Sequence, residues 1–203
     1  MLYATHKAGG CLAALIGYEV LKQQGLLVSG LEDWVQLIIL YPAASFGSTY
    51  PDLDHHWGSV KEHTPFSFLV HKILHLTKPK HRSWQTHSWV LSALICSALF
   101  LLLYSVSALN IPITSQALSL LRLIFMGFSL GLGSHLFLDT FTRQGTWLVP
   151  GIKFKLVPNS PVFSTGTTYE SVVRAILYIA CGLALIWVLN PFDIQGVIKG
   201  VFA

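Results

Sequence analysis

The chain has 203 residues, of which 53% are hydrophobic and only 11% are charged, and its formal net charge is +4. Soluble domains carry about 25% charged residues, so this composition argues against a water-soluble protein and indicates an integral membrane protein. The length allows one domain of about five membrane spans, because each helix needs roughly 20 residues to cross the hydrocarbon.

Apolar segments follow one another along the chain and predict a single all-α membrane domain over residues 1–203. The first segment is the weakest, because Glu19 and Lys22 interrupt its far half, whereas the third has no charged residue. The fourth carries Arg122 near its start, where a long side chain can reach the membrane interface. The predicted spans are 8–27, 34–49, 88–109, 116–140 and 170–189.

Two polar connections, 52–86 and 143–169, separate the predicted spans. Part of the first, 66–76, has apolar residues on both sides of a helical pattern and is too short to cross the membrane. It therefore predicts an interfacial amphipathic helix. The second connection contains prolines and short β-favouring pieces such as 152–157, so it predicts a small extended flap.

The distribution of basic residues predicts the orientation in the membrane. Five crossings would put the N-terminus and both polar connections on one side. Only Lys22, Arg122 and Lys199 of the 13 Lys and Arg residues would then lie on the other side. This bias predicts that the N-terminus and both connections are cytoplasmic. Because topology accounts for the positive charge, we expect no nucleic-acid partner.

Candidate metal ligands gather at the ends of the predicted helices, all on the same side of the membrane. They are His6 before the first span, Asp52, Asp54 and His55 after the second, His87 before the third, and His135 with Asp139 at the end of the fourth. Imidazole and carboxylate are the usual ligands of zinc and related divalent ions when no thiolate is offered. The pattern predicts a divalent metal site at this membrane face.

Local spacing and electrostatics support the same prediction. His135 and Asp139 are four residues apart in a helical pattern, so they project from one helix face. Asp52 and Asp54 can both turn inward if the backbone there is extended. Carboxylates near helix C-termini are unfavourable unless a cation compensates them. A dication would do so, and Arg82 or Arg143 could supply part of the compensation.

The predicted ligands leave the number of ions and some simpler interpretations open. Six ligands, His6, Asp52, Asp54, His87, His135 and Asp139, exceed one tetrahedral shell. They would suit two ions, or one ion with carboxylates that hydrogen-bond to its ligands. Taken singly, His6 could be an ordinary interfacial residue, the two aspartates could cap a turn, and His135 could bond to another helix.

In their order and spacing, these motifs resemble the YdjM-like bacterial inner-membrane proteins, generally described as membrane-bound metal-dependent hydrolases. The resemblance covers roughly residues 5–174. It rests on His6, on 51–55 (PDLDH), on His81-Arg82 with 86–88 (THS), and on 133–142 (GSHLFLDTFT) followed by Gly145 and Pro150. The chain departs from the family pattern between Arg82 and Thr86, where a glycine is absent and one residue is added. The resemblance implies hydrolysis at the bacterial inner membrane and leaves the substrate undefined.

Together these features predict a membrane-embedded metal-dependent hydrolase that acts on a lipid or lipid-linked phosphoester. Zinc is the expected ion, with manganese or magnesium as alternatives, and it would lower the pKa of bound water from 15.7 to about 7. His55 and Arg82 are the predicted catalytic side chains, and Arg82 and Arg143 the predicted contacts to a phosphate or head group. The alternatives are a non-catalytic scaffold stapled by metal and, less favoured because the mid-spans are apolar, a metal-ion carrier or sensor.

Overall fold

A computed structural model of the chain describes residues 3–28, 31–54, 82–108 and 114–189. Most of these residues form five long helices: α1 (Tyr3–Gln23), α2 (Asp33–Gly47), α4 (Trp89–Ala108), α5 (Ser115–Thr140) and α6 (Thr168–Leu189). The shorter elements are two 3-10 helices, η1 (Tyr50–Asp54) and η2 (Pro161–Phe163), and two strands, β1 (Thr146–Val149) and β2 (Ile152–Phe154). The predicted all-α membrane class is confirmed.

Each predicted span corresponds to one helix, and the last four agree with their predicted bounds to within two residues at each end. The first span is displaced, because α1 begins at Tyr3 rather than 8 and ends at Gln23 rather than 27. Gly25 has a φ of 65° and donates its N–H to the carbonyl of Lys22, while Leu26 donates to Leu21. Hydrogen bonds of this kind around a glycine commonly end helices. Here they end α1 before the end of the predicted first span.

Three of the described helices, α4, α5 and α6, are long and apolar enough to cross a membrane. Helix α2 has 15 residues, fewer than the roughly 20 that a perpendicular crossing needs. Helix α1 contains Lys7, Glu19 and Lys22 and packs into the bundle rather than facing lipid along its length. The five crossings therefore remain a prediction. The membrane character of the bundle rests on α4, α5 and α6.

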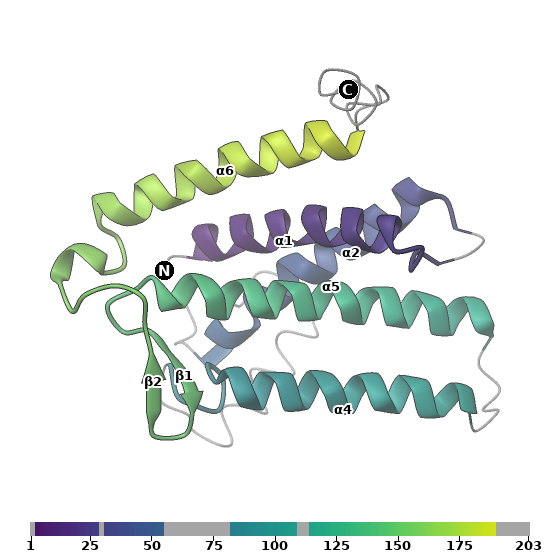
Figure 1. Cartoon of the computed structure of the whole chain (residues 1–203), viewed down its shortest axis with the longest axis horizontal. Coiled ribbons are helices and arrows are strands. Elements are labelled where there is room, and N and C mark those ends of the chain that lie inside the picture. The colour runs from purple at the N-terminus through teal and green to yellow at the C-terminus, as the bar shows by residue number, and fades with distance from the viewer. Residues whose placement is uncertain (1–2, 29–30, 55–81, 109–113, 190–203) are drawn as a thin grey trace, which may run out of the picture.

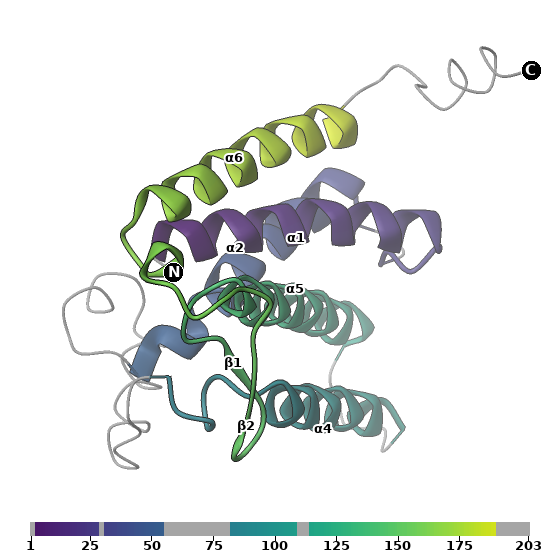
Figure 2. The same cartoon turned by 60° about the vertical axis from the view of Figure 1, so that its left-hand side comes forward.

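The bundle is organised around α5, which lies between α1 and α4 in both views (Figures 1 and 2). Buried residues of α1, α2 and α5 form the apolar core, with Ala14, Leu40 and Leu123 among its members. Helix α6 packs against α1 and exposes apolar side chains such as Ile179, as expected of a surface that faces lipid.

Helices α2 and α5 approach each other so closely that glycine is required on both. A Cβ at Gly131 would overlap the carbonyl oxygen of Ala44, and one at Gly47 would overlap the carbonyl oxygen of Phe128. Small residues of this kind allow close packing of helices inside membranes. The consequence for the candidate site is that the C-terminal end of α2, at Ser48, lies directly against α5.

The predicted flap is a two-stranded hairpin. Strands β1 and β2 pair antiparallel, with Trp147 opposite Lys153. The hairpin follows α5 and packs against the N-terminal end of α4, as Figure 1 shows. The predicted amphipathic helix within 66–76 lies outside the described residues.

Five helix ends meet at one end of the bundle, at the left of Figure 1: the N-termini of α1, α4 and α6 and the C-termini of α2 and α5. The hairpin and η1 lie at the same end. Alternating helix directions predict this arrangement, and it brings together segments that are far apart in the sequence.

The two glycines on α5 provide a matched test of the packing. We expect Gly131→Ala to lower the melting temperature of the purified protein, because overpacking a close contact costs roughly 1–3 kcal/mol. A Cβ at Gly133, two residues later, meets no heavy atom within 4 Å. Gly133→Ala should therefore leave the melting temperature unchanged or raise it, since alanine favours helix by about 1 kcal/mol. Equal melting temperatures for the two variants would contradict the close α2–α5 contact.

Candidate metal centre

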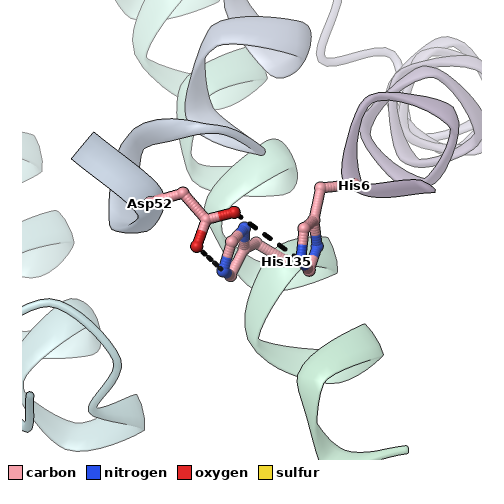
Figure 3. Close-up of side chains that lie close together, drawn as sticks. All are labelled: His6, Asp52 and His135. Carbon is pink, nitrogen blue, oxygen red and sulfur yellow. Dashed lines mark ion pairs between the residues drawn. The ribbon is translucent and has the colours of Figure 1, made fainter. Parts of the chain in front are cut away.

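Five of the six predicted ligands come together at the end of the bundle where the helix ends meet. His6 comes from α1, Asp52 from η1, His87 from the residue pair directly before α4, and His135 and Asp139 from α5. Figure 3 shows His6, Asp52 and His135 pointing toward one another from three elements. We call these five residues the His/Asp cluster. Its histidines and Asp139 are fully buried, and the Asp52 side chain is 19% exposed.

Both carboxylates of the cluster face the same three imidazole nitrogens. The Nε2 atoms of His6, His87 and His135 lie 3.5, 3.7 and 3.5 Å from carboxylate oxygens of Asp139. The same atoms lie 3.9, 3.6 and 3.9 Å from carboxylate oxygens of Asp52. These separations exceed an ordinary hydrogen bond and are close to the roughly 3.4 Å between ligand atoms around a tetrahedral ion with bonds of about 2.1 Å.

Among the residues that the structure describes, two overlapping groups of three could each hold a metal ion. One consists of His6, Asp52 and His135, and the other of His87, His135 and Asp139. His135 belongs to both groups, and its Nε2 lies 3.4 Å from the Nε2 of His87. The two groups therefore share one location rather than forming separate sites.

The ring of His135 is oriented by the backbone of α2. Its Nδ1 lies 2.6 Å from the carbonyl oxygen of Ser48. A carbonyl can only accept, so Nδ1 carries the proton and Nε2 presents a lone pair to the cluster when the ring is neutral. Such a bond from the distal ring nitrogen typically orients metal-binding histidines. The ring of His87 is held in a similar way by the hydroxyl of Thr86, 2.9 Å from its Nδ1.

His6 is the member whose polar atoms most clearly require a ligand. Among the described residues, neither ring nitrogen of His6 has a hydrogen-bond partner, although the side chain is completely buried. Leaving a buried polar group unsatisfied costs about 1–3 kcal/mol. The ring stacks on His135 with centroids 3.7 Å apart, so its Nε2 is aimed at the same point. The donor set thus fits a divalent ion, which would coordinate Nε2.

Arg82 contacts the cluster through Asp139. Its Nη2 lies 3.3 Å from Oδ1 of Asp139, and its Nη1 donates to the hydroxyl of Thr142, which in turn donates to the backbone carbonyl of Asp139. The side chain is only 9% exposed. Arg82 therefore holds the Asp139 carboxylate in place and neutralises part of its charge.

The hairpin holds the segment that carries Arg82 and His87. Trp147 donates its indole N–H to the carbonyl of Arg82 and its backbone N–H to the carbonyl of His87. Ser88 donates to the carbonyl of Leu148, and its hydroxyl also accepts from the N–H of Leu91 in the first turn of α4. The 86–88 motif thus orients the ring of His87, caps α4 and joins both to the hairpin.

Gly145 connects α5 to the hairpin in a way that other residues would not allow. Its φ is 65°, and a Cβ at this position would lie 2.5 Å from the carbonyl oxygen of Phe154. The left-handed conformation and the close approach both favour glycine. This accounts for the glycine that follows the 133–142 motif.

The Asp52 carboxylate lies in η1, outside the predicted spans. Burial raises its pKa, but attraction to His135 and interactions with the nearby His87 and His6 rings outweigh burial, so that the pKa lies well below its usual range. Asp52 is therefore ionised at neutral pH. The backbone around it is a 3-10 helix rather than the extended chain that would allow Asp52 and Asp54 to turn inward together. The reason is the turn that continues directly from α2, where Asp52 donates its N–H to the carbonyl of Thr49.

Three predicted site residues are not part of the described cluster. Arg143 is exposed and donates through Nε to the side-chain oxygen of Asn159, and no contact between its side chain and the cluster occurs among the described residues. The backbone of Asp54 ends η1, but its side chain is not among the described parts of the structure. His55 lies outside the described residues.

Several residues that support the cluster were not predicted from the sequence. Thr86 is adjacent to His87, so its role could have been inferred from the motif. The carbonyl of Ser48 could not, because a backbone group leaves no signal in the sequence. Buried Glu170 accepts from the hydroxyl of Thr5 at 3.0 Å and from the N–H of Gly166 at 2.7 Å, and so ties α6 to the turn that carries His6. An acid in the first turn of a helix is common without such a role.

Comparison with known proteins identifies the family. A model of the YdjM inner membrane protein family matches residues 1–195. No curated protein and no solved structure gave a match. The matched region includes every described residue, and with it the whole His/Asp cluster. The chain therefore belongs to the YdjM inner membrane protein family.

Proposed function

We propose that this membrane protein is a metal-dependent hydrolase that acts at the bilayer surface, on a lipid or lipid-linked phosphoester. The observation that carries the proposal is the buried convergence of three imidazole nitrogens and two carboxylates from four separate segments. Three of the five residues are completely buried histidines whose Nε2 atoms all face carboxylate oxygens. Protein interiors rarely bury two acids together without a compensating cation.

The donor set favours zinc, with manganese or magnesium as alternatives. Three imidazoles and two carboxylates suit zinc and related ions, and the two carboxylates would balance the charge of a dication. Because both candidate groups share His135, we expect one ion rather than two. Once bound, such an ion would polarise a phosphoryl oxygen and supply hydroxide at neutral pH.

The remaining polar groups near the cluster have separate proposed roles. Arg82 is a positioning residue, because it contacts Asp139 directly and keeps one carboxylate oxygen oriented. Its planar guanidinium also makes it the best placed described cation to hold a phosphate oxygen. His55 as acid or base and Arg143 as a head-group contact remain predictions.

The hairpin supports a location at head-group depth. Leu148, Ile152 and Phe154 expose apolar side chains on it. Lys153, on the same hairpin, and nearby Lys155 add positive charge. Apolar and basic residues together favour the interface of an anionic leaflet. The positive charge on this side of the predicted topology further favours a cytoplasmic location.

A metal-stapled scaffold is the alternative that the geometry also favours. Ligands from α1, η1, α5 and the segment before α4 would cross-link four parts of the fold. Five donors can also fill a coordination shell and leave no open position. The two proposals differ in one respect, because only a hydrolase needs a position that water or substrate can occupy.

The metal content of the purified protein tests the site. We expect about one divalent ion per chain, measured by elemental analysis after purification without added metal. His135→Ala combined with Asp139→Ala should abolish it. Asp33→Ala is the matched control, because Asp33 is an exposed carboxylate paired with Lys22 at 2.9 Å, outside the cluster. Unchanged metal content in the double variant, with folding verified by circular dichroism, would remove the ligand assignment.

Hydrolysis of a lipid phosphoester panel tests the activity. Activity should be lost on chelation, restored by zinc or manganese, and abolished by Asp139→Asn. Arg82→Lys should lower it by about 10–100-fold, the range for partners that orient a metal ligand, because lysine cannot make both contacts of the guanidinium. A protein that holds its ion yet hydrolyses nothing on the panel would favour the scaffold.

A further inference from the structure

We propose that an apolar groove between α1, α4 and α5 binds a hydrocarbon chain of the lipid whose head group lies at the His/Asp cluster. This inference rests on the proposed function and names the part of the substrate that the cluster itself does not contact. The groove has a volume of about 700 Å³. Its lining includes Gly17, Val20, Cys96, Phe100, Met126 and Leu130.

Small residues line the groove, and its wall is largely apolar. Gly17 allows α1 to approach α5, because a Cβ there would overlap the Leu130 side chain. Ser97 and Cys96 supply small side chains on α4. The hydroxyl of Ser129 donates to the carbonyl of Phe125 in its own helix at 2.9 Å. The wall is therefore apolar, as a hydrocarbon chain requires.

The near part of the groove lies at the depth of the chains of one leaflet, and its far end lies near the middle of the bilayer. At a rise of 1.5 Å per residue, Leu130 lies about 8 Å from His135 along α5, and Gly17 lies about 17 Å from His6 along α1. Phe100 lies about 20 Å from His87 along the path of α4 by the same measure. Half of a hydrocarbon core about 30 Å thick is about 15 Å. A lipid whose head group lies at the cluster would have its chains at the depth of the groove.

The surface of α5 between the groove and the cluster end is open. Gly133 lies one turn beyond Ser129 and Leu130, and a Cβ there would meet no heavy atom within 4 Å. One turn further, Phe137 is exposed. This side of α5 is therefore accessible from the lipid between the groove and the C-terminal end of the helix.

The size of the groove argues for a chain rather than a protein helix. Its volume falls within the roughly 300–1,000 Å³ that is usual for small-molecule sites. A protein helix with its side chains is about 10–12 Å across, which is bulkier than a hydrocarbon chain. The candidate spans α4 and α5 form two of its walls, so lipid hydrocarbon is what surrounds its opening. The size of the groove and its surroundings both favour a hydrocarbon chain, acyl or isoprenyl.

Filling the groove from either wall tests the inference. Ser97→Phe narrows it from α4 and Val20→Trp from α1, and Ile179→Phe on the exposed face of α6 is the control. The substrates are a phosphatidic acid with long chains and bis-p-nitrophenyl phosphate, which has none. We measure the hydrolysis rate of phosphatidic acid divided by that of bis-p-nitrophenyl phosphate. This ratio should fall at least about tenfold in Ser97→Phe and Val20→Trp, the two filled variants, and stay at the wild-type value in the control. An unchanged ratio in both filled variants, with metal retained, would overturn the inference.

Photolabelling separates this inference from the proposed function. Nanodiscs would contain a trace of phosphatidic acid with a mid-chain diazirine, and labelled peptides would be identified by mass spectrometry. We expect label on Phe100 and Met126 several-fold above that on Ile179, and loss of this excess in the filled variants. Equal labelling of groove and α6, or cross-links between copies of the protein there, would overturn the inference. If wild type hydrolyses neither substrate, the proposed function fails, and the labelling alone decides whether a chain occupies the groove.

Discussion

The charge balance of two buried carboxylates is the constraint on which the rest of this structure depends. Asp52 and Asp139 face the same three imidazole nitrogens, and both lie where helix C-termini add partial negative charge. Their repulsion would be large in a poorly solvated environment. Arg82 contacts Asp139 and neutralises part of the negative charge. The remaining negative charge requires a cation or protonated histidines, and the unsatisfied nitrogens of His6 favour a cation that imidazole can coordinate.

The fold holds the side chains of the cluster largely through backbone groups and ring Nδ1 atoms. Close approach at Gly131 brings the carbonyl of Ser48 to the ring of His135. Trp147 fixes the segment that carries His87. The rings of His135 and His87 are thus held through their Nδ1 atoms, which point away from the centre of the cluster. A single misplaced helix would affect several ligands together, because α5 alone carries two of them.

The sequence was sufficient for the helices and for the meeting of their ends, because apolar runs and alternating directions are properties of the chain itself. The spacing of His135 and Asp139 likewise determines a shared helix face. It was not sufficient for the local backbone at Asp52, which is a 3-10 helix and not the extended chain on which an inward turn of both Asp52 and Asp54 depended. It predicted that Arg82 or Arg143 could compensate the carboxylates, but not which of the two does so or that the contact is to Asp139. The start of α1 was misplaced because its polar first turn is buried by tertiary packing, which periodicity does not register.

In the proposed function, water and the scissile bond must meet at the same depth, and this requirement would account for the cluster and the groove occupying different parts of the same helices. A buried polar cluster at the bilayer centre would lack water, and one on a soluble domain would lack the lipid. Helix ends satisfy both conditions, because the chain leaves the hydrocarbon there while the helix below remains in it. Helices α1 and α5 carry ligands at this end and groove walls further along, and α4 begins directly after His87. In the proposed function, the same helices therefore set the distance between the bound phosphoester and the bound hydrocarbon chain.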